Sequence, residues 1–348
     1  GEGSWQANCN QAGQLRADLT VPRVDETQTA ASVLPAADSD YIDVAATTSN
    51  DLDLLAPRVT QEIRELIEKA DPTLDADVAA WFDPTSTVPK LTTLGPVSLS
   101  LGAGGNATAV ASRKAYYLEL VVFLGLHPEG VTKDQIAEAM GLSPERARTP
   151  MSVLRDWLGQ NPATGRFYVP ESTQSLVGRE RGINLYSLEG VLVDADLFRR
   201  LRSRGEARAN HGIPDLRTAL KLVQGRPLDQ LREKGGLWLL DDRADQVLTC
   251  GVVDVAHVVA TDALFKKDYA VARAVAELAS LVAPYDEISH LDLAAIATAE
   301  GRFAEADRIL RSEVCQRSDE DGAYLDLTER AARIIQGHGW LQPQKAAS

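Results

Sequence analysis

Hydrophobic positions follow two different periods along this chain, and the change of period separates its predicted elements. Over residues 51–70 large apolar residues recur every three or four positions, which predicts an amphipathic helix that ends at Asp71-Pro72. Beyond Pro89 the period becomes two, because Val97, Leu99 and Leu101 alternate with polar residues. Residues 90–101 therefore predict a pair of strands, interrupted at Gly95-Pro96.

Three further helices are predicted after a glycine-rich loop at residues 102–106. They cover residues 112–126, 132–141 and 149–158. Thr132 and Gln135 have the spacing of a capping box at the start of the second helix. Thr149 is the expected N-cap of the third helix, with Pro150 at its first position. The glycine-rich loop lacks the Gly-Lys-Ser/Thr ending of a phosphate-binding loop, so we do not expect it to bind a nucleotide.

Two strands are predicted next, over residues 165–169 and 183–188, with a polar loop at 170–182 between them. Strands, three helices and then a β-hairpin follow the order of a winged helix-turn-helix. In that arrangement the hairpin, with its loop, is the wing.

The rest of the chain is predicted to be helical and contains an internal repeat with a period of about 34 residues. Asp268-Tyr269-Ala270-x-Ala272 aligns with Arg302-Phe303-Ala304-x-Ala306, and Pro284 lies where a closing proline is expected in the first unit. Small residues also match in the preceding helix of each unit, at Ala260 and Ala294. This spacing is typical of a tetratricopeptide-like repeat, in which small residues are buried where helices cross.

These elements define a mainly α protein with a small β component, in which a winged helix-turn-helix precedes a tetratricopeptide-like helical domain. Residues 1–50 are poor in large apolar residues, so we expect a disordered linker there. An acidic helical lead-in over 51–88 is expected to dock through Leu55, Val59, Ile63, Trp81 and Phe82. The winged helix-turn-helix covers residues 89–193, and the helical domain covers residues 194–342.

Charge is distributed unevenly along the chain. The net formal charge is −14, and residues 1–88 alone hold 16 acidic and five basic residues. Residues 89–195 hold ten of each sign. A basic run follows at Arg199, Arg200, Arg202, Arg204 and Arg208. It has two interpretations, a solvated helix face or a site for an anionic partner such as the acidic N-terminal segment of the same chain.

DNA binding by a winged helix requires an exposed basic third helix and a basic wing. The candidate DNA-binding residues are Arg146, Arg148, Ser152 and Arg155 at the third helix and Arg166, Arg179 and Arg181 in the wing. Arg155 is the first choice for a base contact, since its guanidinium can pair bidentately with guanine. Acidic residues offset this charge, so a winged helix used only for packing remains open.

Several other function classes find little support. Three scattered cysteines and five scattered histidines form no metal-binding motif, and no catalytic or dinucleotide motif is present. No apolar run is long enough to cross a membrane. We therefore expect a cytoplasmic protein without enzymatic activity, cofactor or metal.

The order of these segments resembles that of a known family. Arg113-Lys114, Leu118-Glu119-Leu120 and residues 126–132 resemble the winged helix of actinobacterial regulators of the antibiotic-regulatory type. Residues 193–198 and 225–228 resemble their bacterial transcriptional activator domain. Residues 71–77 and 81–84 look like the lead-in of a subgroup whose members are long proteins, some with membrane segments and a LysM module upstream.

The resemblance implies a transcription regulator that binds double-stranded DNA and contacts a protein or peptide through its helical repeats. The alternative is a scaffold without DNA binding, which uses both parts for protein–protein contacts. Such a scaffold could be the cytosolic part of a larger, membrane-anchored protein.

Overall fold

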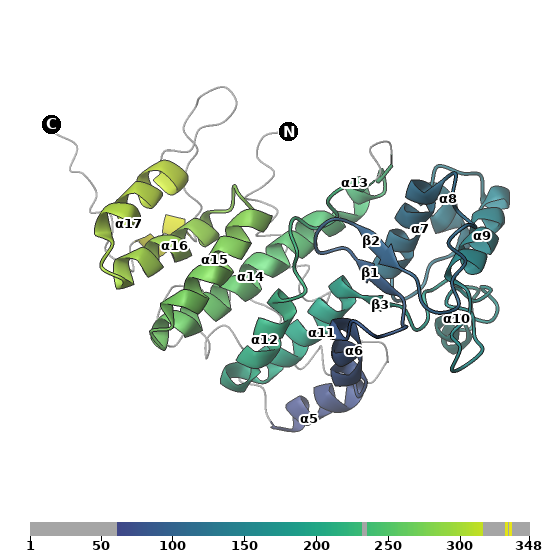
Figure 1. The fold of residues 1–348 in the computed structure, drawn as a ribbon, viewed down its shortest axis with the longest axis horizontal. Helices are drawn as coiled ribbons and strands as arrows, with labels where there is room; N and C mark the ends of the chain where they lie inside the picture. Colours follow the sequence, from purple (N-terminus) through teal and green to yellow (C-terminus); the bar gives the residue numbers. More distant parts are fainter. Residues whose placement is uncertain (1–60, 232–234, 316–330, 333, 336–348) are drawn as a thin grey trace. The chain divides into compact units, whose positions relative to one another are not determined.

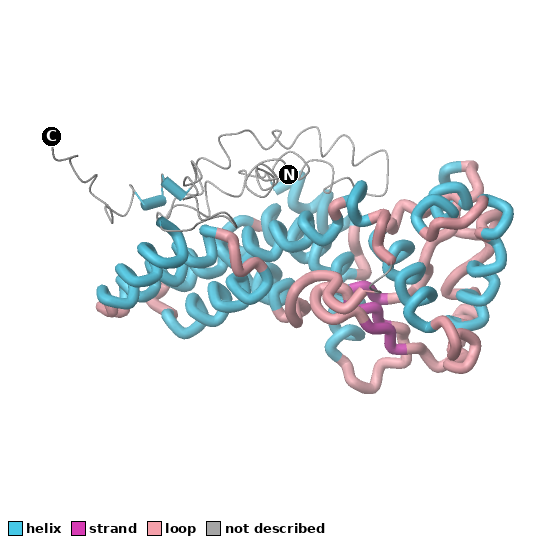
Figure 2. Tube along the Cα trace, turned by 90° about the horizontal axis from the view of Figure 1, so that it is seen from above, coloured by secondary structure: helices cyan, strands magenta, loops and turns pink. Residues whose placement is uncertain are grey.

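The computed structural model describes residues 61–231, 235–315, 331–332 and 334–335. The described part is mainly helical with three short strands, so the expected mainly α class with a small β component is confirmed (Figures 1 and 2). The predicted linker at residues 1–50 lies outside the described residues. So do Leu55 and Val59 of the predicted lead-in.

The chain divides into two compact units that interleave along the sequence. Among the described residues, unit 1 comprises 61–70, 201–221 and those from 249 onward, and unit 2 comprises 71–200, 222–231 and 235–248. The division falls within two helices, α11 (Asp194–Ala207) and α14 (Ala244–Phe265).

Unit 2 contains a three-stranded sheet in the order β2-β1-β3. Strands β1 (Lys90–Thr92) and β2 (Ser98–Ser100) pair antiparallel with Leu91 opposite Leu99, which confirms the predicted strand pair. Strand β3 (Leu192–Val193) runs parallel to β1. The sequence does not predict β3, because two residues are too few to display a period.

The three predicted helices are present in unit 2 as α7 (Lys114–Leu126), α8 (Lys133–Ala139) and α9 (Arg148–Leu158). The capping box of Thr132 and Gln135 is formed as predicted. Thr149 is not the N-cap of α9. A 3₁₀ turn, η1 (Pro144–Arg146), leads directly into the helix, and Ala147 is its N-cap.

The predicted β-hairpin of the wing is not formed, and this expectation is corrected. Residues 165–169 and 183–188 contribute only isolated bridges, of Gln160 with Phe167 and of Val131 with Tyr186. The expected loop contains helix α10 (Leu176–Arg181), which Ser175 caps by accepting a hydrogen bond from the Gly178 N–H at 2.9 Å. Each predicted strand pairs with backbone outside the hairpin, and so the hairpin ladder does not form.

The N-terminal helices are α5 (Gln61–Ala70) of unit 1 and α6 (Leu74–Phe82) of unit 2. No residue of α5 is fully buried, and Ile63 is half-buried. In α6 the buried anchor is Leu74, whereas Trp81 is half-buried and Phe82 is 46% exposed. The predicted docking through Phe82 is therefore not observed. A short helix, α13 (Leu239–Asp242), lies near the end of unit 2.

Unit 1 is built from helices. After α11 come η2 (Ala209–Gly212) and α12 (Ile213–Leu220), and after α14 come α15 (Tyr269–Val282), α16 (Glu287–Ala299) and α17 (Phe303–Ile309). A π-helical segment, η3 (Leu310–Cys315), follows α17. The side chains of Ala263, Ala272, Ala276 and Ile296 form a common buried cluster.

The helix junctions of unit 1 recur at the predicted interval. Helices α14 and α16 end at Phe265 and Ala299, and α15 and α17 begin at Tyr269 and Phe303, so that the two junctions are related by the period of the sequence repeat. In the two turns Lys267 and Gly301 have positive φ angles of 60° and 76°. The four alanines predicted to lie at helix crossings are all buried, namely Ala260, Ala272, Ala294 and Ala306.

Helix α14 is long and apolar enough to cross a membrane by length and composition alone, although no membrane-spanning segment is expected from the sequence. Of its most apolar 18-residue window, 67% is buried inside the protein. This extent of burial is typical of a core helix, whose apolar residues contact other helices.

Candidate nucleic-acid interface

The outward face of α9 carries part of the predicted DNA-binding set. Arg148, Ser152 and Asp156 are exposed at intervals of four residues, with the exposed Thr149 next to Arg148, while the buried side chains are those of Met151, Leu154, Trp157 and Leu158. Arg146 is exposed in η1, directly before the helix. Neither Arg146 nor Arg148 forms an ion pair with any residue that the structure describes. The first half of α9 thus presents the guanidinium of Arg148 and the hydroxyl of Ser152, and the guanidinium of Arg146 lies just before it.

Arg155 points into the protein. Its Nε donates a hydrogen bond to the Val169 carbonyl at 2.9 Å, and its Nη1 lies 3.7 Å from Glu171 Oε1. The guanidinium lies 5.8 Å from the centre of the Phe167 ring, and the side chain is only 17% exposed. These contacts tie α9 to the segment that follows it, and they leave few donors for a base.

Arg166 is held in a similar way. Its Nη2 donates to Glu189 Oε2 at 2.9 Å and to the Gln174 carbonyl at 3.3 Å. The other oxygen of Glu189 accepts a hydrogen bond from the Leu176 N–H at 2.6 Å. Arg166 and Glu189 therefore connect the segment before α10 to the start of that helix.

Arg179 and Arg181 remain exposed in the last turn of α10. Neither forms an ion pair within the described part of the chain. Glu180 lies between them and is exposed as well.

Two carboxylates flank the outward face of α9. A hydrogen bond from its own backbone N–H, and another from the Ser143 hydroxyl, hold the pKa of Glu145 below its ordinary value. Asp156 at the other end accepts a hydrogen bond from Asn106 Nδ2 at 3.1 Å. The face is thus of mixed charge, which limits the phosphate attraction that basic residues alone would give.

The glycine-rich loop at residues 102–106 supports α9. The Asn106 N–H donates to the Trp157 carbonyl at 2.9 Å. Gly159 ends the helix with φ of 76°, and a Cβ at this position would collide with the Gly104 carbonyl. These contacts give the loop a packing role at the end of the helix.

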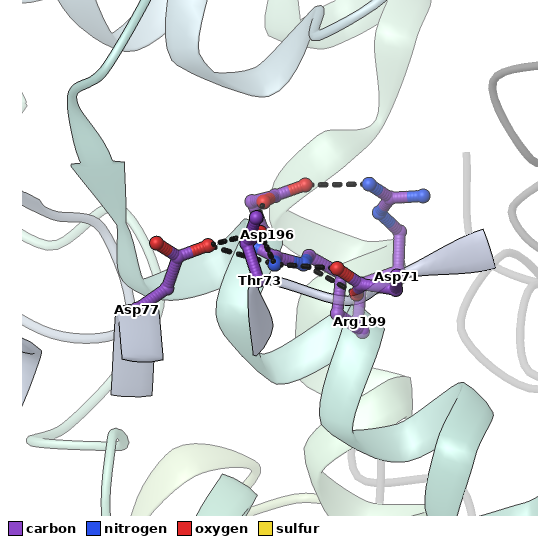
Figure 3. A network of polar contacts seen from close by, with 6 residues as sticks. Asp71, Thr73, Asp77, Asp196 and Arg199 are labelled. Carbon is purple, nitrogen blue, oxygen red and sulfur yellow. Dashed lines mark hydrogen bonds and ion pairs between the residues drawn. The ribbon is translucent and has the colours of Figure 1, made fainter. Parts of the chain in front are cut away.

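The basic run of α11 is occupied by carboxylates, several of them from the acidic lead-in. In unit 2, Arg200 donates to both oxygens of Asp71 at 2.7 Å, to Thr73 Oγ1 at 3.0 Å and to Asp77 at 2.8 Å. Figure 3 shows Asp71, Thr73 and Asp77 in this network of polar contacts, in which Asp196 pairs with Arg199. Although burial opposes the charged form, the carboxylates of Asp71, Asp196 and Asp77 raise the pKa of Arg200.

The remaining arginines of the run are paired in unit 1. Arg208 contacts Glu68 and Asp215, both at 2.8 Å, and Arg204 also contacts Asp215 at 2.8 Å. Arg202 contacts Glu206 at 2.7 Å and Asp254 at 3.6 Å. Of the two interpretations of this run, the anionic partner within the same chain is the observed one.

Among the described residues no group of three or more His, Cys, Asp or Glu side chains is arranged to hold a metal ion. Compared with models of protein families and with curated proteins, the sequence matches none.

Proposed function

We propose that this chain is a transcription-regulator-like protein with two binding parts. A helix-turn-helix in unit 2, formed by α7, α8, η1 and α9 and followed by α10 in place of the expected wing hairpin, contacts double-stranded DNA. The repeated helices of unit 1 form a tetratricopeptide-like surface for a protein or peptide. The proposal is one of binding, without a catalytic step or a cofactor, and it places the protein with DNA in the cytoplasm.

The observation that carries the DNA contact is the exposed first half of α9. In helix-turn-helix proteins the residues near the N-terminus of the recognition helix contact base edges, while flanking residues contact phosphates. Arg148 and Ser152 lie on that part of α9, exposed to solvent. Arg146 lies just before the helix and is a candidate phosphate contact.

The structure changes the roles that we assign to the other candidates. The hydrogen bond of Arg155 to Val169 favours a positioning role in which Arg155 holds the following segment against α9, and the contacts of Arg166 with Glu189 and the Gln174 carbonyl favour one in which Arg166 holds its own segment beside the start of α10. Base contact is then assigned to Arg148 and Ser152, and phosphate contacts at α10 are assigned to Arg179 and Arg181.

The test is a comparison of variants of the full chain by fluorescence anisotropy with labelled genomic fragments at low salt. Replacing both Arg146 and Arg148 by Ala should weaken binding at least tenfold, because a base contact and a phosphate contact are lost. The matched control replaces Arg226 and Arg308, two exposed arginines outside α9, and should change binding less than threefold. Equal losses in both variants would show that only overall charge matters.

A second candidate function is a scaffold that binds proteins and not DNA. It is favoured by the internal contacts of Arg155 and Arg166 and by the balance of charge over residues 89–195. If neither the full chain nor a chain without residues 1–60 binds any fragment at low salt, the scaffold replaces the DNA-binding proposal.

A further inference from the structure

Unit 2 exposes three large hydrophobic side chains around α10, apart from the outward face of α9. Leu176 is 55% exposed, Ile183 is 53% exposed and Phe167 is 38% exposed. Phe167 and Leu176 belong to segments joined by Glu189, which binds Arg166 on one oxygen and the Leu176 N–H on the other. The N–H of Ile183 donates to the Gly178 carbonyl at 3.0 Å, which folds Ile183 back onto the end of α10. We call Phe167, Leu176 and Ile183, together with Arg179 and Arg181, the α10 patch.

The polar surroundings of the patch are positive. The pairs Arg155–Glu171 and Arg166–Glu189 balance their own charges. On α10 itself Arg179 and Arg181 outnumber Glu180, and neither arginine has an ion-pair partner among the described residues. The patch therefore combines exposed apolar area with net positive charge.

This combination fits a protein segment better than a nucleic acid. Exposed apolar side chains that gather in one place mark protein interaction sites, and arginine and aromatic residues are enriched there. A DNA backbone offers phosphates to Arg179 and Arg181, but it offers no apolar surface to Leu176 or Ile183. An acidic amphipathic peptide satisfies both groups, because its carboxylates can pair with the arginines while its apolar face covers the hydrophobic side chains.

We propose that the α10 patch binds an acidic amphipathic segment of a partner protein. Leu176, Ile183 and Phe167 contact the apolar face of the segment, and Arg179 and Arg181 pair with its carboxylates. The inference uses none of the residues on the outward face of α9, but it shares Arg179 and Arg181 with the proposed phosphate contacts, so the segment and DNA would compete for these two arginines.

The test uses the full chain and a labelled synthetic peptide that is long enough to form several helical turns, with Leu and Phe at helical spacing and Glu or Asp elsewhere. Binding is measured by fluorescence polarisation. Two double variants, Leu176→Ser with Ile183→Ser and Arg179→Gln with Arg181→Gln, should each weaken binding at least tenfold. Replacing Glu and Asp in the peptide by Gln and Asn should weaken binding to the same extent.

The matched control is Leu237→Ser with Leu240→Ser, an exposed leucine pair elsewhere in unit 2 that should leave the affinity within twofold. Circular dichroism and thermal unfolding confirm that each variant is folded. The proposal is overturned if the peptide does not bind, or if the control weakens binding as much as the α10 variants do. It is also overturned if only the arginine variant has an effect and a DNA duplex or an anionic vesicle competes for the same surface.

Discussion

At the scale of single residues, the buried carboxyl of Asp194 joins the end of β1 to the start of α11. It accepts hydrogen bonds from the N–H and hydroxyl of Thr93, at 2.8 and 2.6 Å, from the Leu94 N–H at 2.9 Å and from the Ala195 N–H at 2.8 Å. Burial raises the pKa of Asp194 to about 6, and the hydrogen bonds oppose that rise. The site is therefore sensitive to pH.

Asp194 makes the folded state more stable at low pH than at neutral pH. The pKa in the folded chain lies above the value of about 3.9 for an unfolded aspartate, so the folded state binds the proton more tightly. The contribution of protonated Asp194 to the stability of the fold is complete below about pH 4 and is lost as the pH rises through 6. Relative to Asp194→Asn, the wild-type free energy of unfolding should fall by about 2–3 kcal/mol between pH 4 and 7. Urea unfolding of both proteins measures this, and a difference that stays constant with pH would contradict it.

Arg155 should act on stability more than on sequence preference. Replacing it by Ala removes the hydrogen bond to Val169 and the packing on Phe167, which should lower the free energy of unfolding by about 1–2 kcal/mol. Arg148→Ala is the matched control on the same helix and should leave stability within about 0.5 kcal/mol, because Arg148 is exposed. Urea unfolding compares the two, and the reverse order would place Arg155, not Arg148, at the outer face.

At the scale of elements, the packing of α15 on its neighbours depends on small residues. Ala272 is fully buried in the cluster with Ala263 and Ile296. Ala272→Leu should overpack this contact and cost about 1–3 kcal/mol. Ala270→Leu lies two residues away on the exposed side of α15 and should cost less than about 0.5 kcal/mol. The melting temperatures of the two variants are compared by thermal unfolding. Equal melting temperatures would show that Ala272 does not lie at a close helix crossing.

Helix α6 is held by charge as much as by apolar contact. Arg200 has contacts with Asp71, Thr73 and Asp77, whereas Leu74 is the one fully buried side chain of α6. Arg200→Ala should leave these carboxylates without their cation and cost about 2–3 kcal/mol. Limited proteolysis should then cut within α6 much faster than in Arg226→Ala, which replaces an exposed arginine. An unchanged cleavage pattern would show that the apolar anchor is sufficient.

Sequence reasoning succeeded where the determining residues are close together in the chain. The capping box of Thr132 and Gln135 lies within one helical turn, and the internal repeat comes from two local helix junctions of the same kind. It failed for α10, because the partners of the predicted wing strands, such as Val131 for Tyr186, are set by tertiary contacts. Tertiary contacts also explain why the orientation of Arg155 was predicted wrongly. From the sequence Arg155 is expected to face outward, but in the fold its side chain contacts Val169 and Glu171.

At the scale of the whole molecule, the chain before the first described helix carries a net negative charge. Residues 1–60 hold nine acidic and three basic residues. Because like charge lowers the local attraction for phosphate, removing residues 1–60 should tighten DNA binding several-fold at low salt, and the gain should shrink as salt is added. The cut precedes Gln61 so that α5, with the contact of Glu68 to Arg208, and the contacts of Asp71 and Asp77 with Arg200 stay intact. A weaker or unchanged affinity would assign these residues another role.

The salt dependence of binding, measured together with sequence preference, shows whether Arg146 and Arg148 at the start of α9 contact DNA. For one bound genomic fragment, the logarithm of the association constant is measured against the logarithm of the salt concentration for the wild type, Arg146→Ala and Arg155→Ala. Loss of the phosphate contact of Arg146 should reduce the slope by about one, whereas Arg155→Ala should leave the slope unchanged. Arg148→Ala should in addition reduce the preference of the protein for that fragment over unrelated DNA. Binding that is absent at the lowest salt, or a slope that changes with Arg155 and not with Arg146, would contradict the claim.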